Sequence, residues 1–176
     1  MSNDKLFKIA GWCALGCVAA MVAALILLMF VPSFGIILEI LFLLMLIVVF
    51  YALYVTHRSE SSNLSLAGLV LAGLAILADL ISLLSDGTAF LISLWYLMLA
   101  LSLLIFGYLA WSSSKMPRGL AIAALVAGGF FLLAGFAGFL GSAAFAGTVS
   151  LIAILAMLVW LIWLWRVFWS KKLLTP

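Results

Sequence analysis

A run of 47 residues, from Gly119 to Trp165, contains no charged side chain. A helix that crosses a lipid bilayer needs about 20 mostly apolar residues, so this run is long enough for two crossings. The same character extends over the whole chain, of which 70% is hydrophobic and only 7% is charged. Such a chain has too little polar surface for a water-soluble fold, and it is predicted to be an integral membrane protein.

Five short clusters of Pro, Ser, Gly, Asp and charged residues interrupt the apolar sequence. Strands of a membrane barrel would alternate apolar and polar residues, and the segments between the clusters do not. We therefore expect an all-α, polytopic membrane protein, a bundle of six transmembrane helices made of three helical hairpins in one domain, residues 1–176. The predicted helices are 9–31, 34–56, 64–84, 89–111, 119–140 and 144–168.

The basic residues predict the orientation of the chain. All eight flank helix ends that share one side of the membrane when the chain crosses it six times. Because basic residues beside transmembrane helices stay in the cytoplasm, both termini are expected to be cytoplasmic, in the inner (plasma) membrane of the cell. The net charge of +3 reflects this topology, and no nucleic-acid partner is expected. The residues are Lys5, Lys8, Arg58, Lys115, Arg118, Arg166, Lys171 and Lys172.

Tryptophan side chains near the same helix ends are predicted to anchor the protein in the headgroup layer, which tryptophan prefers. They are Trp12, Trp111, Trp163, Trp165 and Trp169.

The first apolar run, preceded by Lys5 and Lys8, is similar to a secretory signal. However, it continues to Val31, and no cleavage site followed by a polar region appears. We expect the first helix to remain in the protein.

The sequence offers few groups for chemistry. It has one histidine, His57, and none of the motifs typical of hydrolases, metalloproteases or nucleotide-binding loops. Cys13 and Cys17 are too few ligands for a zinc site and are interpreted as small packing residues. No catalytic residue, metal or cofactor is expected, and the protein is not predicted to be an enzyme.

Small residues predict which helix faces pack together, because close backbone approach drives helix association in lipid. If any transmembrane helix is broken, the predicted place is the pair Gly128-Gly129. The packing residues are predicted to be Gly68, Ala72, Ala75, Gly128, Gly135 and Gly138.

A spacing of 57 residues relates parts of the chain to one another. Gly11 and Gly16 recur at this interval as Gly68 and Gly73, which predicts a duplicated hairpin. The alternative is that hairpins sized to one bilayer share a period without common ancestry.

Glu39 and Asp79 are the only acidic residues inside the predicted helices. Each lies five residues from the same end of the membrane, at a depth of roughly 7 to 8 Å. Desolvation is expected to leave at least one carboxyl protonated near neutral pH. The two residues are predicted to form either a hydrogen-bonded structural pair or a proton or cation site.

The stretch Arg118-Gly119-Leu120-Ala121 opens a glycine-rich hairpin that resembles the acid-resistance membrane proteins of the HdeD type. The resemblance covers residues 118–168, although the hairpin lacks the proline that such hairpins often carry between their helices. It implies a small bacterial membrane protein connected with stress.

Two functions remain open from the sequence. The first is a structural, accessory or stress-related protein without a catalytic site. Its expected partners are the lipid bilayer and further copies of itself or another membrane protein. The second is a transporter or channel for a proton, cation or small solute that uses Glu39 and Asp79. We favour the first, because function inside a membrane usually requires more polar groups than two carboxyls.

Overall fold

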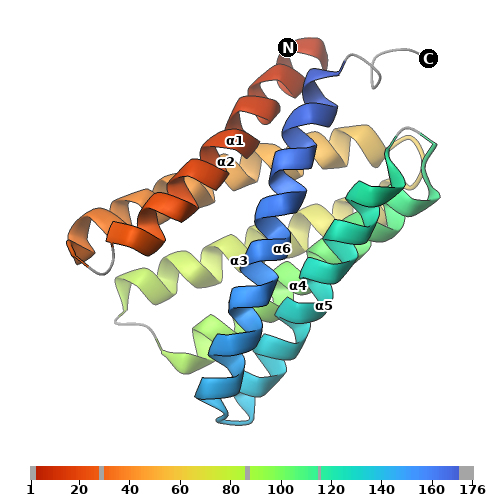
Figure 1. Ribbon diagram of the computed structural model, residues 1–176. Coiled ribbons are helices and arrows are strands. Elements are labelled where there is room, and N and C mark those ends of the chain that lie inside the picture. Colours follow the sequence, from red (N-terminus) through yellow and green to blue (C-terminus); the bar gives the residue numbers. More distant parts are fainter. Residues whose placement is uncertain (1–2, 28–29, 86–87, 115, 171–176) are drawn as a thin grey trace. The chain divides into compact units, whose positions relative to one another are not determined.

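The computed structural model describes residues 3–27, 30–85, 88–114 and 116–170. Within these residues the secondary structure consists of six helices and no strand, which confirms the predicted all-α class (Figure 1). Each of the six is long and apolar enough to cross a membrane. The helices are α1 (Asn3–Leu27), α2 (Pro32–His57), α3 (Ser62–Leu84), α4 (Ala89–Ser112), α5 (Arg118–Phe139) and α6 (Ala143–Trp169).

Large apolar side chains cover the outer faces of the helices. Leu74, Phe136 and Leu155, for example, are all exposed. Each apolar Å² left in water costs about 25 cal/mol, so a surface of this kind is stable only in lipid. The chain is therefore a multi-pass membrane protein.

The turn before α2 differs from the prediction. We expected the first helix to reach residue 31 and Pro32 to lie in a turn, whereas α1 ends at Leu27 and Pro32 is the first residue of α2. Proline suits the first helical position because the N–H it lacks would have no partner within the helix there. The turn therefore lies before the proline.

Gly141 ends α5 at a predicted break. Its φ of +77° lies in the left-handed region, which favours glycine. The N–H of Ser142 donates to the carbonyl oxygen of Ala137 at 2.9 Å, and the N–H of Gly141 donates to that of Gly138 at 3.1 Å. These two bonds form a Schellman motif, so the turn into α6 depends on a glycine here.

The chain forms two compact units. The first contains Met1–Ala52 and Leu161–Pro176, and so includes α1, most of α2 and the end of α6. The second is Leu53–Trp160, which includes α3, α4, α5 and most of α6. The single domain expected from the sequence stays a prediction.

In the first unit, the start of α1 lies beside the end of α6, where the rings of Phe7 and Phe168 stack with centroids 5.8 Å apart. Further along, α1 contacts α2 through Cys17, whose buried thiol donates to the carbonyl oxygen of Phe42 at 3.6 Å.

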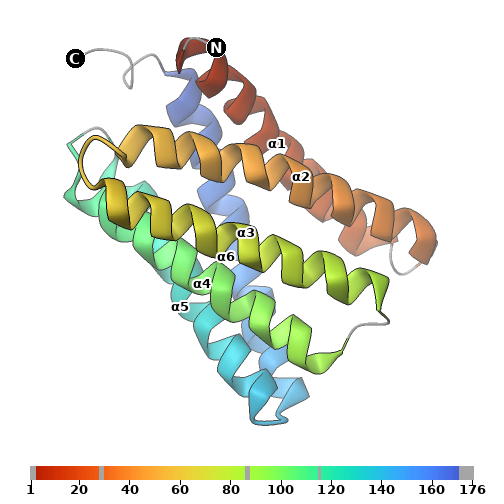
Figure 2. The same cartoon turned by 180° about the vertical axis from the view of Figure 1, so that it is seen from behind.

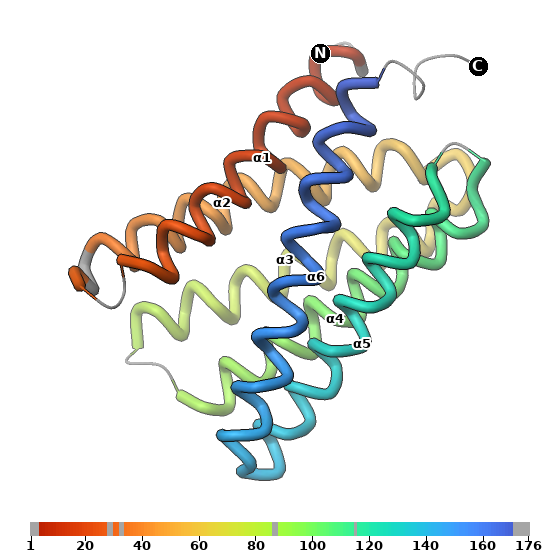
Figure 3. The backbone as a smooth tube through the Cα atoms, in the orientation of Figure 1, coloured from red at the N-terminus to blue at the C-terminus, as the bar shows by residue number. Residues whose placement is uncertain are grey.

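In the second unit, α4 packs against both α3 and α5 (Figure 2). Helix α5 is continuous along its length (Figure 3), including the pair Gly128-Gly129. The helix break considered for this pair is therefore not present.

Candidate functional site

The two carboxyls predicted to act together lie in different units. Glu39 is in the first unit, on α2, and is half-buried. Asp79 is in the second unit, on α3, and only 6% of it is exposed. Close approach of the two side chains stays a prediction.

Small residues form most of the buried face of α3, together with Ile76 and Asp79. At Gly68 an added Cβ would lie 2.8 Å from Cε2 of Phe106 on α4. The hydroxyl of Ser102, also on α4, donates to the carbonyl oxygen of Gly68 at 2.8 Å. The backbone of α3 therefore touches α4 at this point. The buried residues of α3 are Ser65, Gly68, Ala72, Ala75, Ile76, Ala78, Asp79 and Ser82.

Three glycines of α5 bring that helix against the backbone of α4. An added Cβ would lie 3.1 Å from the carbonyl oxygen of Ala100 at Gly128, and 3.1 Å from that of Ser93 at Gly135. At Gly138 it would meet the hydroxyl of Ser93. Side chains of α4 also lie against these glycines, namely Leu104 at Gly128 and Leu97 at Gly135.

Other glycines make no such contact. An atom added at Gly73 or Gly129 would meet nothing within 4 Å. The adjacent residues Gly128 and Gly129 therefore differ, because only Gly128 contacts a neighbouring helix. The glycine content of a helix does not by itself identify its contacts.

The predicted anchor residues lie mostly on the surface. Trp12, Trp111, Trp163 and Trp169 are exposed, whereas Trp165 is half-buried. In the first unit, Trp12 and Trp169 meet edge to face with ring centroids 5.6 Å apart. In the second, the guanidinium of Arg118 lies 6.0 Å from the centre of the Trp111 ring.

A polar cluster that we did not predict joins the α2–α3 loop to the end of α4. The Oε2 atom of Glu60 lies 3.0 Å from Nδ1 of His57, whose side chain is fully buried. The hydroxyl of Ser113 donates to Oε1 of Glu60 at 2.7 Å. One carboxylate thus connects the last residue of α2 to the residue that caps α4.

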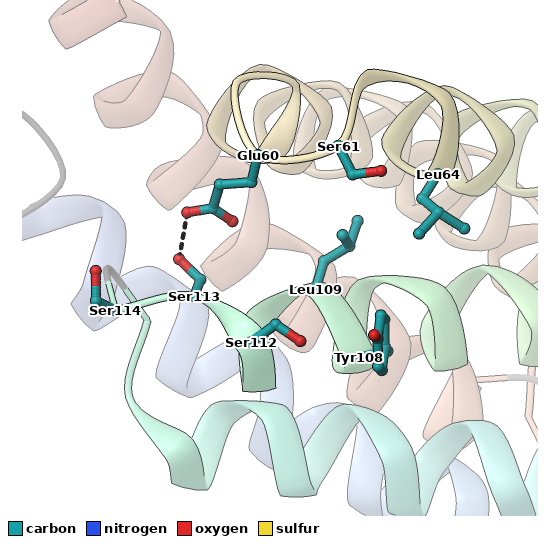
Figure 4. Close-up of a pocket in the computed structure, with 8 residues that line it drawn as sticks. All are labelled: Glu60, Ser61, Leu64, Tyr108, Leu109, Ser112, Ser113 and Ser114. Atoms are coloured by element: carbon teal, nitrogen blue, oxygen red, sulfur yellow. Dashed lines mark hydrogen bonds between the residues drawn. The ribbon is translucent and has the colours of Figure 1, made fainter.

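The same carboxylate lines a cavity of about 480 Å³, here named the loop pocket (Figure 4). The pocket lies between the start of α3 and the end of α4. Its lining residues are Glu60, Ser61, Leu64, Tyr108, Leu109, Ser112, Ser113 and Ser114.

The cluster supplies one imidazole, one carboxylate and one hydroxyl, with the carboxylate between the other two. In the part of the chain that the structure describes, no three His, Cys, Asp or Glu side chains are placed to hold a metal ion.

The sequence contained only an indirect signal of this cluster. The polar clusters 57–63 and 112–118 follow the second and fourth predicted helices, which end on the same side of the membrane. That pattern places the two loops at one level, but it does not show that their side chains meet.

Comparison of the chain with protein-family models, with curated proteins and with solved structures finds no significant match. The resemblance to HdeD-type proteins stays a prediction.

Proposed function

We propose that this chain is a structural or accessory protein of a bacterial inner membrane, connected with stress and without a catalytic centre. In this proposal it acts through contacts of its helices with lipid and with other membrane proteins or further copies of itself. The close packing of α4 on α5 is the observation that carries the proposal.

Glycine contacts of this kind support a packing role. The backbone of α5 approaches carbonyl oxygens of α4 at Gly128 and Gly135, and α5 continues without a break. A transporter or channel requires polar groups along a path, or helices interrupted near the middle of the membrane. In the described residues α4 and α5 are unbroken, and the polar side chain that α4 presents to the glycines of α5 is the hydroxyl of Ser93.

Exposed basic residues support an orientation with both termini in the cytoplasm. Lys5 lies in the first turn of α1, Arg58 follows α2, Arg118 begins α5 and Arg166 lies in the last turn of α6. Six crossings put these four helix ends on one side, which the preference of basic residues assigns to the cytoplasm.

Transport of a proton, cation or small solute is the second function that we consider, and the burial of Asp79 favours it. A carboxyl inside a transmembrane helix is costly, and such groups often belong to ion or proton pathways. In this alternative Asp79 carries the site and Glu39 assists it.

Flux measurements separate the two functions. The purified protein is reconstituted into liposomes, and acid-driven entry of protons is followed with an internal pH dye. We expect the same flux as in protein-free liposomes. Flux that is well above this level in the parent protein, lost in Asp79→Asn and retained in a Ser142→Ala control, would contradict the accessory role. Flotation of the liposomes confirms equal incorporation of each variant.

A further inference from the structure

The carboxylate of Glu60 is held in one position by two partners on different oxygen atoms. Nδ1 of His57 lies 3.0 Å from Oε2, and the hydroxyl of Ser113 donates to Oε1 at 2.7 Å. The Glu60 side chain nevertheless remains 29% exposed and forms part of the wall of the loop pocket. A side chain fixed before binding loses little conformational entropy when a ligand arrives.

Every polar side chain in the lining of the loop pocket presents oxygen. The set consists of one carboxylate, from Glu60, with the hydroxyls of four serines and of Tyr108. The pocket also borders the end of α4, at Ser112, where helix carbonyl groups carry partial negative charge. These groups favour a positively charged ligand that donates hydrogen bonds.

The pocket lies at the level where lipid headgroups are expected. It is formed at the ends of two membrane-spanning helices, and the nearby aromatic side chains of Tyr108 and Trp111 are exposed, as is typical of the headgroup layer. A headgroup at this level that carries a primary ammonium matches the oxygen lining of the pocket.

We propose that the loop pocket binds the headgroup of an aminophospholipid. The carboxylate of Glu60 and the pocket hydroxyls accept hydrogen bonds from the primary ammonium. A volume of about 480 Å³ is sufficient, because pockets for small molecules typically measure about 300–1,000 Å³. The inference requires that α3 and α4 cross the membrane, and it does not depend on the accessory role.

Lipid binding to the full-length protein in detergent, measured by native mass spectrometry, tests the proposal. Phosphatidylethanolamine is compared with phosphatidylcholine of identical acyl chains, whose trimethylammonium group has the same charge but donates no N–H. We expect about tenfold tighter binding of phosphatidylethanolamine, the value of one charge-assisted hydrogen bond. Equal affinity for the two lipids would overturn the proposal. Free ethanolamine that competes as strongly as the lipid would overturn the assignment to a lipid.

Two variants connect this preference to the pocket. Glu60→Gln keeps the side-chain size and removes the charge, so it is expected to abolish the preference for phosphatidylethanolamine. Tyr108→Phe removes one exposed hydroxyl outside the His57–Glu60–Ser113 cluster, and it is expected to weaken binding about threefold without a change in thermal stability. Ser142→Ala, in the α5–α6 turn, is the control. A preference that persists in Glu60→Gln, or an affinity that is unchanged in Tyr108→Phe, would refute the role of the loop pocket.

Discussion

Gly135→Ala is expected to destabilise the contact between α4 and α5. The added Cβ would lie 2.7 Å from Cγ of Leu97 and 3.1 Å from the carbonyl oxygen of Ser93. The leucine can rotate, but the carbonyl group belongs to the backbone, so the two helices must separate by a few tenths of an ångström. Overpacking of this kind typically costs about 1–3 kcal/mol. Alanine regains up to about 1 kcal/mol of helix propensity. If all of it is regained, the net loss is about 0–2 kcal/mol, and the loss relative to an alanine that meets no neighbour stays at about 1–3 kcal/mol.

Gly129→Ala is the matched control, because it makes the same chemical change in the same helix. An atom added at Gly129 meets nothing within 4 Å. The variant therefore avoids the overpacking cost and gains only helix propensity. We expect it to be as stable as the parent protein or up to about 1 kcal/mol more stable.

The free energy of unfolding is measured for the parent protein and both variants by titration with sodium dodecyl sulfate in mixed micelles, with tryptophan fluorescence as the signal. The reasoning requires that Gly135→Ala unfolds at a lower detergent fraction than Gly129→Ala. If the two variants are equally stable, α4 does not lie against α5 as described.

Ser102→Ala removes the hydrogen bond to the carbonyl oxygen of Gly68. In the same unfolding assay it is expected to lower the free energy of unfolding by about 0.6 kcal/mol, which is typical of interhelical hydrogen bonds in membranes. In a background without native cysteines, an impermeant maleimide added to intact cells is expected to label Ser142→Cys but not Ser114→Cys; the reverse pattern would contradict the proposed orientation. Native mass spectrometry in detergent and in lipid discs is expected to show a homo-oligomer, and a monomer in both would remove that expectation.

The predicted helix positions were close to the observed ones where a strong local signal was present. Gly141 ends α5 where we expected a break, because a left-handed residue followed by the turn into α6 is a local requirement of the backbone. The start of α2 was less accurate, because Pro32 is compatible both with a turn and with the first position of a helix.

The loop pocket is the main feature of the structure that we did not predict from the sequence. His57 and Glu60 are three residues apart, so their contact is local, but Ser113 is 53 residues from Glu60 and reaches it only when α3 and α4 fold back on each other. Hydropathy and charge place the two loops on one side of the membrane, but they do not show that their side chains meet. The duplicated hairpin likewise stays a prediction.

The sequence by itself determined that the chain consists of membrane-spanning helices. A backbone in lipid must satisfy its hydrogen bonds internally, in helices or in a closed barrel, and apolar segments without alternation fit only helices. Only the tertiary structure decided which small residues make contacts. Gly128 and Gly129 are the same residue type and are adjacent in the sequence. Successive residues of a helix point in directions about 100° apart. As a result, only Gly128 faces α4. The packing of the helices decides which side of each helix faces a neighbour. The contacts of α4 with α3 and α5 are therefore known only from the fold.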